Sequence, residues 1–207
     1  MFIKLLLSLA CMGYGSVLPQ QASKIIQKPD YKTYVSREYS FTLQYPPNYG
    51  LKAYGSESFV FIEKNEFWVD FDVFNIEKLV ALLADFRKEK SMTEDRFREV
   101  IIDRAIAYSG ADGPDGSYQC SDPEIVDDFI NRNGLRTLKF YLTGTLSNYT
   151  DGTEISKRTG PFYGVKISVN DKPHAILIRY KRQALASADH EKMLKKIVES
   201  ISSIKLE

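Results

Sequence analysis

The chain has 207 residues, of which 43% are hydrophobic and 13% aromatic, so it has enough apolar material for one folded domain of ordinary size. Its 28 basic and 27 acidic residues leave a formal net charge of +1. This balance excludes the strong positive field that is typical of nucleic-acid-binding proteins, and we expect no nucleic-acid partner.

The N-terminal segment has the features of a secretory signal peptide. Lys4 precedes an apolar run that begins at Leu5, and small residues follow near 13–16. The run is too short and too interrupted by Gly and Pro for a membrane span, which needs about 20 apolar residues. We therefore predict a signal peptide over residues 1–18 and export to the periplasm or the extracellular space. Residues 19–36 are polar and contain two prolines, which predicts a linker.

Two alternatives remain open for this segment. The sequence "SLAC", which ends at Cys11, resembles a bacterial lipobox, although Ser8 stands where the pattern has Leu. A lipid on Cys11 would tether the protein to a membrane, and this anchor is the only membrane contact that we expect. The other alternative is an N-terminal strand or helix that is buried in the fold.

The domain proper is predicted over residues 37–207. In "YSFTLQY", Phe41, Leu43 and Tyr45 alternate with polar residues, which predicts a half-buried strand that ends at Pro46 and Pro47. Further strands are expected over 58–63 and 67–76. Helical spacing of leucines predicts a helix over 77–90, and Ser91 with Glu94 resembles a capping box at the start of a second helix. The compositions of 109–117 and 131–134 indicate loops.

The second half of the chain has the pattern of an antiparallel meander. Strands are expected from Leu135 onward, with turns at 151–152 and 170–171, and a final amphipathic helix is expected within 187–204. The strand over 175–180 is apolar on both faces, so both faces of the sheet are expected to be covered. The predicted fold class is α+β, with an antiparallel sheet between helices in three layers.

Two stretches resemble the PsbP-like family. "YSFTLQYPPNYGL" is similar to the opening strand of that family, which closes on Tyr-Pro and is followed by an aromatic residue, and "AILIRYKR" with "EKMLKKIVESISSI" is similar to its last strand and C-terminal helix. The family includes the extrinsic P subunit of photosystem II, bacterial lipoproteins and, by structure, the Mog-type nuclear import factors. The resemblance implies a three-layer α/β/α fold and no shared catalytic residues. Tyr49 stands where the family usually has tryptophan.

No catalytic motif is present in the sequence. A nucleophile elbow, a phosphate loop, a dinucleotide fingerprint and a Cys-x-x-Cys pair are all missing, and Leu194 occupies the position that a zinc-protease helix would give to a second histidine after His190. We therefore predict no catalytic residue and no cofactor.

Four residues of one predicted strand are candidates for a site. Asp70 and Asp72 lie two residues apart, so their carboxylates share a face and could divide acid and base roles, but a solvated pair is the commoner arrangement. Trp68 and Phe74 flank them on that face, which suits either a partner-contact patch or a surface under a helix.

The acidic residues Asp112, Asp115 and Asp122, with Gly113 and Gly116, resemble a calcium loop with a poor match of ligand positions. They are the candidates for a metal site.

The sequence thus favours an exported, monomeric, non-enzymatic PsbP-like module that binds an unknown protein or a small ligand. A hydrolase that uses the face of Asp70 and Asp72 is one alternative. A carrier for a small apolar ligand is another, and an enclosed cavity of a few hundred Å³ would distinguish it.

Overall fold

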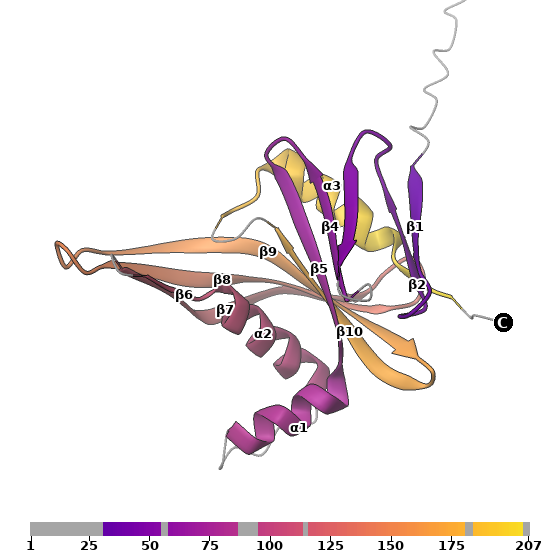
Figure 1. The fold of residues 1–207 in the computed structure, drawn as a ribbon, viewed down its shortest axis with the longest axis horizontal. Coiled ribbons are helices and arrows are strands. Elements are labelled where there is room, and N and C mark those ends of the chain that lie inside the picture. The colour runs from indigo at the N-terminus through magenta and orange to yellow at the C-terminus, as the bar shows by residue number, and fades with distance from the viewer. Residues whose placement is uncertain (1–30, 55–57, 87–94, 114–115, 181–183, 205–207) are drawn as a thin grey trace, which may run out of the picture.

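The described residues form two antiparallel sheets and three helices (Figure 1). This computed structural model describes residues 31–54, 58–86, 95–113, 116–180 and 184–204. The eight strands of the larger sheet are, in spatial order, β3 (Gly50–Tyr54), β4 (Phe59–Lys64), β5 (Phe67–Asn75), β10 (Lys172–Tyr180), β9 (Glu154–Val169), β8 (Arg136–Asn148), β7 (Gly116–Ile130) and β6 (Ala111–Gly113). Every pairing in it is antiparallel. The predicted α+β class with a mainly antiparallel sheet is confirmed.

A smaller sheet holds the strand that the sequence placed first. Its order is β1 (Lys32–Ser36), β2 (Phe41–Tyr45) and β11 (Ser202–Ser203), so both ends of the described chain pair with β2. The sequence predicted one sheet and a linker over 19–36, whereas β2 belongs to a second sheet and the last five residues of that range form a paired strand. Phe41 and Leu43 of β2 are fully buried, and their burial holds the small sheet on the larger one.

The helices are α1 (Ile76–Phe86), α2 (Arg96–Ser109) and α3 (Ala188–Ser200). The side chain of Ser187 caps α3 by accepting from the backbone N–H of His190. Asp95 caps α2. The predicted cap at Ser91 was therefore wrong as the start of this helix, and Ser91 and Glu94 lie outside the described residues. The Asp95 carboxylate also accepts from Arg136 of β8 at 2.9 and 2.5 Å, and this guanidinium lowers the pKa of Asp95.

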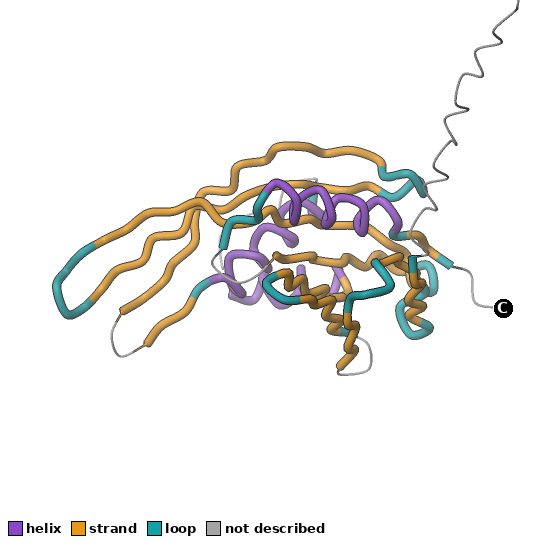
Figure 2. The backbone as a smooth tube through the Cα atoms, turned by 90° about the horizontal axis from the view of Figure 1, so that it is seen from above, coloured by secondary structure: helices purple, strands orange, loops and turns teal. Residues whose placement is uncertain are grey.

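Two buried cores lie on opposite faces of the larger sheet. Strand β10 shows this directly, because Ile176 and Ile178 belong to the core with α3 and the small sheet, whereas Ala175 and Leu177 belong to the core with α2. Successive strand residues point to opposite faces, so the two clusters are separated by the sheet. Figure 2 shows that the β6–β7 and β8–β9 hairpins extend beyond the helices. The range 109–117, expected as a loop, contains β6 and the start of β7, because the hairpin backbone pairs there.

Close packing of α2 on the sheet depends on Gly164 of β9. A Cβ atom at this position would lie 2.7 Å from a side-chain carbon of Ile101, which is fully buried in α2. Such a contact forces either the helix or Ile101 to move.

Gly164→Ala is therefore expected to lower the free energy of unfolding by about 1–3 kcal/mol, the usual cost of overpacking a core. Urea unfolding followed by far-UV circular dichroism measures it. Gly50→Ala is the matched control, because a Cβ there meets its nearest neighbour at 3.6 Å, an ordinary contact. Equal effects at the two glycines would contradict the proposed role of Gly164.

Candidate functional site

One face of β5 and its neighbouring strands carries the four candidate residues. Register places Asp70 of β5 opposite Phe61 of β4 and Arg179 of β10, and Asp72 opposite Phe59 of β4. Directly opposed residues in an antiparallel pair project to the same face. Helix α2 lies over this face at β10 and β9, so the face has a covered part and an open part.

Asp72 lies in the covered part and is paired with a helix residue. Its two carboxylate oxygens accept from Arg104 of α2, at 2.7 Å from Nε and 3.4 Å from Nη2. Its side chain is 2% exposed. The prediction of a solvated carboxylate was wrong for Asp72, because α2 covers it and Arg104 of that helix compensates its charge.

Asp70 is also paired, but it stays accessible. Its Oδ1 accepts from Arg179 Nε at 2.6 Å, and its side chain is 23% exposed. Burial raises the pKa of Asp70 more than Arg179 lowers it. The ionised carboxylate therefore subtracts from the free energy of unfolding, and the subtraction disappears as the pH falls through the raised pKa.

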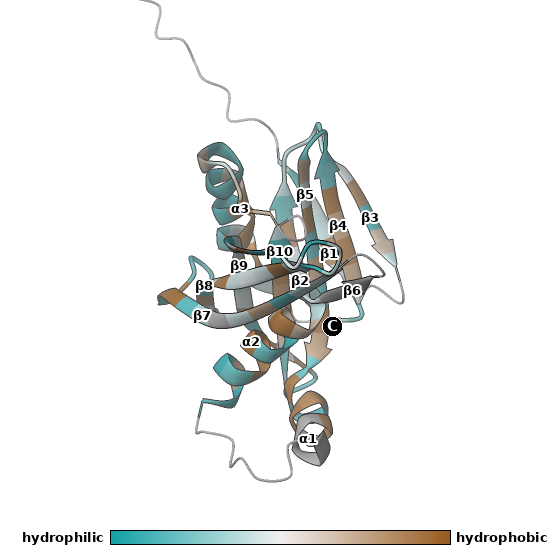
Figure 3. Cartoon of the chain, turned by 90° about the vertical axis from the view of Figure 1, so that its left-hand side faces the viewer, coloured by the Kyte–Doolittle hydropathy of each residue, from teal (hydrophilic) through white to brown (hydrophobic). Residues whose placement is uncertain are grey.

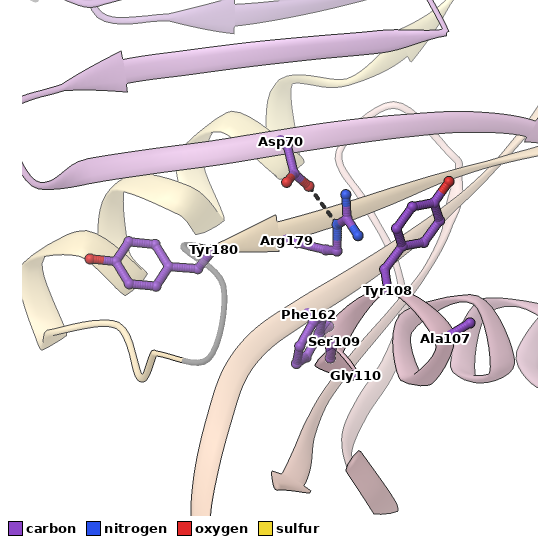
Figure 4. Close-up of a pocket in the computed structure, with 8 residues that line it drawn as sticks. All are labelled: Asp70, Ala107, Tyr108, Ser109, Gly110, Phe162, Arg179 and Tyr180. Atoms are coloured by element: carbon purple, nitrogen blue, oxygen red, sulfur yellow. Dashed lines mark hydrogen bonds and ion pairs between the residues drawn. The ribbon is translucent and has the colours of Figure 1, made fainter. Parts of the chain in front are cut away.

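Tyr108, near the end of α2, contacts both arginines. The guanidinium carbons of Arg104 and Arg179 lie 4.2 and 4.3 Å from its ring centroid, and Arg104 Nη2 also donates to its hydroxyl. Figure 4 shows Arg179 between Asp70 and the Tyr108 ring, with Tyr180 pointing away from this group. Burial raises the pKa of Tyr108. These contacts link α2 to β5 and β10 through charged groups rather than through apolar packing alone.

A pocket of about 280 Å³ adjoins this group. Its walls include Asp70, Arg179, Phe162 of β9, and Tyr108 and Ser109 of α2. We call it the Asp70 pocket. Asp72 does not line it, so the two carboxylates do not face a common space.

The open part of the face carries aromatic side chains. Tyr54 of β3, Phe59 and Phe61 of β4 and Trp68 of β5 border a groove of about 550 Å³, and we call these four residues the aromatic surface. Phe61 makes edge-to-face contacts with Tyr54 and with Trp68, at centroid distances of 5.5 and 6.0 Å. Tyr54 is 55% and Trp68 48% exposed. Figure 3 shows β3 and β4 to one side of α1 and α2, although Phe59 of β4 still contacts Tyr108 of α2 at a centroid distance of 6.4 Å.

The predicted site residues thus separate. Trp68 and Asp70 lie at an accessible surface, Asp72 is closed off, and Phe74 packs into the core below α2 with Arg104 over its ring at 5.5 Å. Asp112 lies in β6 and Asp122 in β7, and Asp115 and Cys11 lie outside the described residues. Within the described part of the chain, no group of three or more His, Cys, Asp or Glu side chains is placed to hold a metal ion.

Sequence reasoning missed the arginines, Tyr108, Tyr54 and Phe61. A signal for Arg104 existed, since it falls in the apolar stripe of its helix between Ile101 and Ala105. An arginine on a buried helix face needs an acidic partner to compensate its charge. Arg179 similarly interrupts a strand that is otherwise apolar on both faces. Nothing local shows which acid each of them meets, because the partners lie 32 and 109 residues away.

None of the described helices is long and apolar enough to cross a membrane. No protein-family model matches the chain, and no curated protein is similar to it in sequence. Among solved structures, it is similar to the solution structure of cyanobacterial PsbP (CyanoP) from Synechocystis sp. PCC 6803. The two are 9% identical, the alignment covers 89% of this chain and 99% of the cyanobacterial one, and the TM-score is 0.44.

Proposed function

We propose that this protein is an exported, non-enzymatic accessory module of three-layer PsbP-like architecture that binds a protein partner through its aromatic surface. The observation that carries the proposal is the exposure of Tyr54 and Trp68 on the part of the sheet face that α2 does not cover. Export rests on the signal-peptide pattern of residues 1–18, with the lipid on Cys11 as the alternative means of tethering. The module acts as a monomer until it meets its partner.

The energetics favour a protein contact at this surface. Aromatic side chains supply much of the binding energy of protein interfaces, and Trp and Tyr are the commonest anchors. The aromatic surface borders the edge of the sheet, because β3 pairs only with β4 among the described strands. A partner therefore finds apolar area and unpaired backbone groups side by side.

The two alternatives fit the geometry less well. A two-carboxylate hydrolase needs one acid and one base at a common space, but Arg104 engages both oxygens of Asp72, and Asp72 does not line the pocket that Asp70 borders. A carrier for an apolar ligand needs an apolar enclosure, whereas the Asp70 pocket is walled by an ion pair.

Truncation of two residues of the aromatic surface is expected to weaken partner binding strongly. The purified mature protein, immobilised and exposed to the envelope fraction of its own host, is compared with the double variant Phe61→Ala/Trp68→Ala. Loss of two interface anchors typically costs 2 kcal/mol or more, which is a loss of affinity of about thirtyfold.

Tyr149→Ala is the matched control, since Tyr149 is 61% exposed on the β8–β9 connection, away from the aromatic surface. It is expected to retain the same proteins as the wild type. The proposal would be contradicted if the double variant retained the same proteins as the wild type. It would also be contradicted if the wild type, the double variant and Tyr149→Ala all failed to retain any protein.

A further inference from the structure

The Asp70 pocket has hydrogen-bonding capacity that the described part of the protein does not use. Arg179 contributes only its Nε to Asp70, and that bond reaches only Oδ1. Among the described residues, neither Asp70 Oδ2 nor the Nη1 and Nη2 groups of Arg179 have a hydrogen-bond partner. The neighbouring pair differs, because Arg104 bonds both oxygens of Asp72. The unused acceptor and donors belong to one ion pair that borders the pocket (Figure 4).

Charge balance restricts what can occupy this place. Asp70 and Arg179 compensate each other, and Asp72 and Arg104 form a second neutral pair beside them. An anion would bind Arg179 but face the Asp70 carboxylate, and a cation would meet the opposite conflict. A ligand that carries both charges side by side satisfies both groups.

The walls and the size restrict the ligand further. Tyr108 and Phe162 provide aromatic surface for an apolar group, and about 280 Å³ lies just below the usual range for drug-sized ligands. We propose that the Asp70 pocket binds a small zwitterion of the α-amino-acid class, with its ammonium on Asp70 Oδ2 and its carboxylate on the Nη groups of Arg179. The raised pKa of Asp70 agrees with this arrangement, because an added cation stabilises the ionised carboxylate.

Three related probes test the proposal by isothermal titration calorimetry on the wild-type protein. Phenylalanine carries both charges, 2-phenylethylamine only the ammonium, and 3-phenylpropionate only the carboxylate. Each charged hydrogen bond is worth about 1.5–3 kcal/mol, so phenylalanine is expected to bind at least about tenfold more tightly than either analogue. The proposal would be overturned if either analogue bound with the same affinity as phenylalanine, or if none of the three probes gave heat at about 10 mM.

Variants separate the two contacts. Asp70→Asn is expected to weaken phenylalanine binding about tenfold or more and to leave 3-phenylpropionate binding unchanged or tighter. Glu63→Gln, which removes an exposed carboxylate paired with Lys52, is the control and is expected to change neither. If Asp70→Asn does not fold, the three wild-type titrations still decide. Trp68→Ala leaves the pocket intact, so unchanged phenylalanine binding in that variant distinguishes this site from the aromatic surface.

Discussion

Asp72→Asn is expected to lower the free energy of unfolding by roughly 3 kcal/mol, because removal of one member of a buried ion pair leaves the other without compensation. Asp72 is 2% exposed and its partner Arg104 27% exposed. The arginine can recover part of its hydration, which places the loss at the lower end of the range for buried pairs. Arg104→Met leaves the more deeply buried charge, the Asp72 carboxylate, without its partner. This variant is expected to lose as much stability or more, about 3–5 kcal/mol.

A double-mutant cycle gives the sharper result. Asp72→Asn/Arg104→Met removes both charges from a face that already packs against Leu177 and Phe74. We expect the double variant to lose less than the sum of the two single variants by 2 kcal/mol or more. Urea unfolding of all four proteins measures the coupling. Additive losses would contradict a buried pair, and Glu63→Gln in the exposed Lys52 pair is expected to change stability by less than about 1 kcal/mol.

Asn131→Ala is the second large loss that the structure predicts, at about 2–4 kcal/mol. This side chain is 3% exposed in the connection between β7 and β8. Its Nδ2 donates to the carbonyl oxygens of Val198 and Ile201 at 3.4 and 3.0 Å. Its Oδ1 accepts from the backbone N–H groups of Asn133 and Leu135, both at 3.0 Å. One amide therefore ties the end of α3 to the connection between β7 and β8.

The cost follows from the backbone groups left behind, since a buried polar group that loses its partner costs about 1–3 kcal/mol. Asn133→Ala is the control, because its more exposed amide contacts the same helix end at 3.3 and 3.0 Å. It is expected to cost about 1 kcal/mol. If thermal and urea unfolding give equal losses for the two asparagines, the connection is not held by Asn131.

The sequence predicted elements better than their partners. The strands at β4, β5 and β10 and the helix α3 were recovered, because period-2 and helical spacing are local properties of the chain. The small sheet was missed, since the pairing of β2 with β1 and β11 depends on residues about 160 positions apart as well as on near neighbours. Local periodicity carries no information about such pairings.

The candidate site was predicted in the same partial way. The alternation of the sequence correctly placed Trp68, Asp70, Asp72 and Phe74 on one face. It did not predict which half of that face α2 covers. That division depends on where Gly164 lets the helix approach the sheet, which is a tertiary property. It separates an exposed Trp68 from a buried Asp72 only four residues later.

The central claim is that partners contact the aromatic surface, and site-specific photocrosslinking tests it most directly. The protein is produced in its own host with p-benzoylphenylalanine in place of Trp68, the single tryptophan of the chain, or in place of Tyr149 as the control. We expect ultraviolet light to give a discrete crosslinked product from position 68 and none of the same mass from position 149. The same product from both positions, or no product from position 68, would contradict the claim.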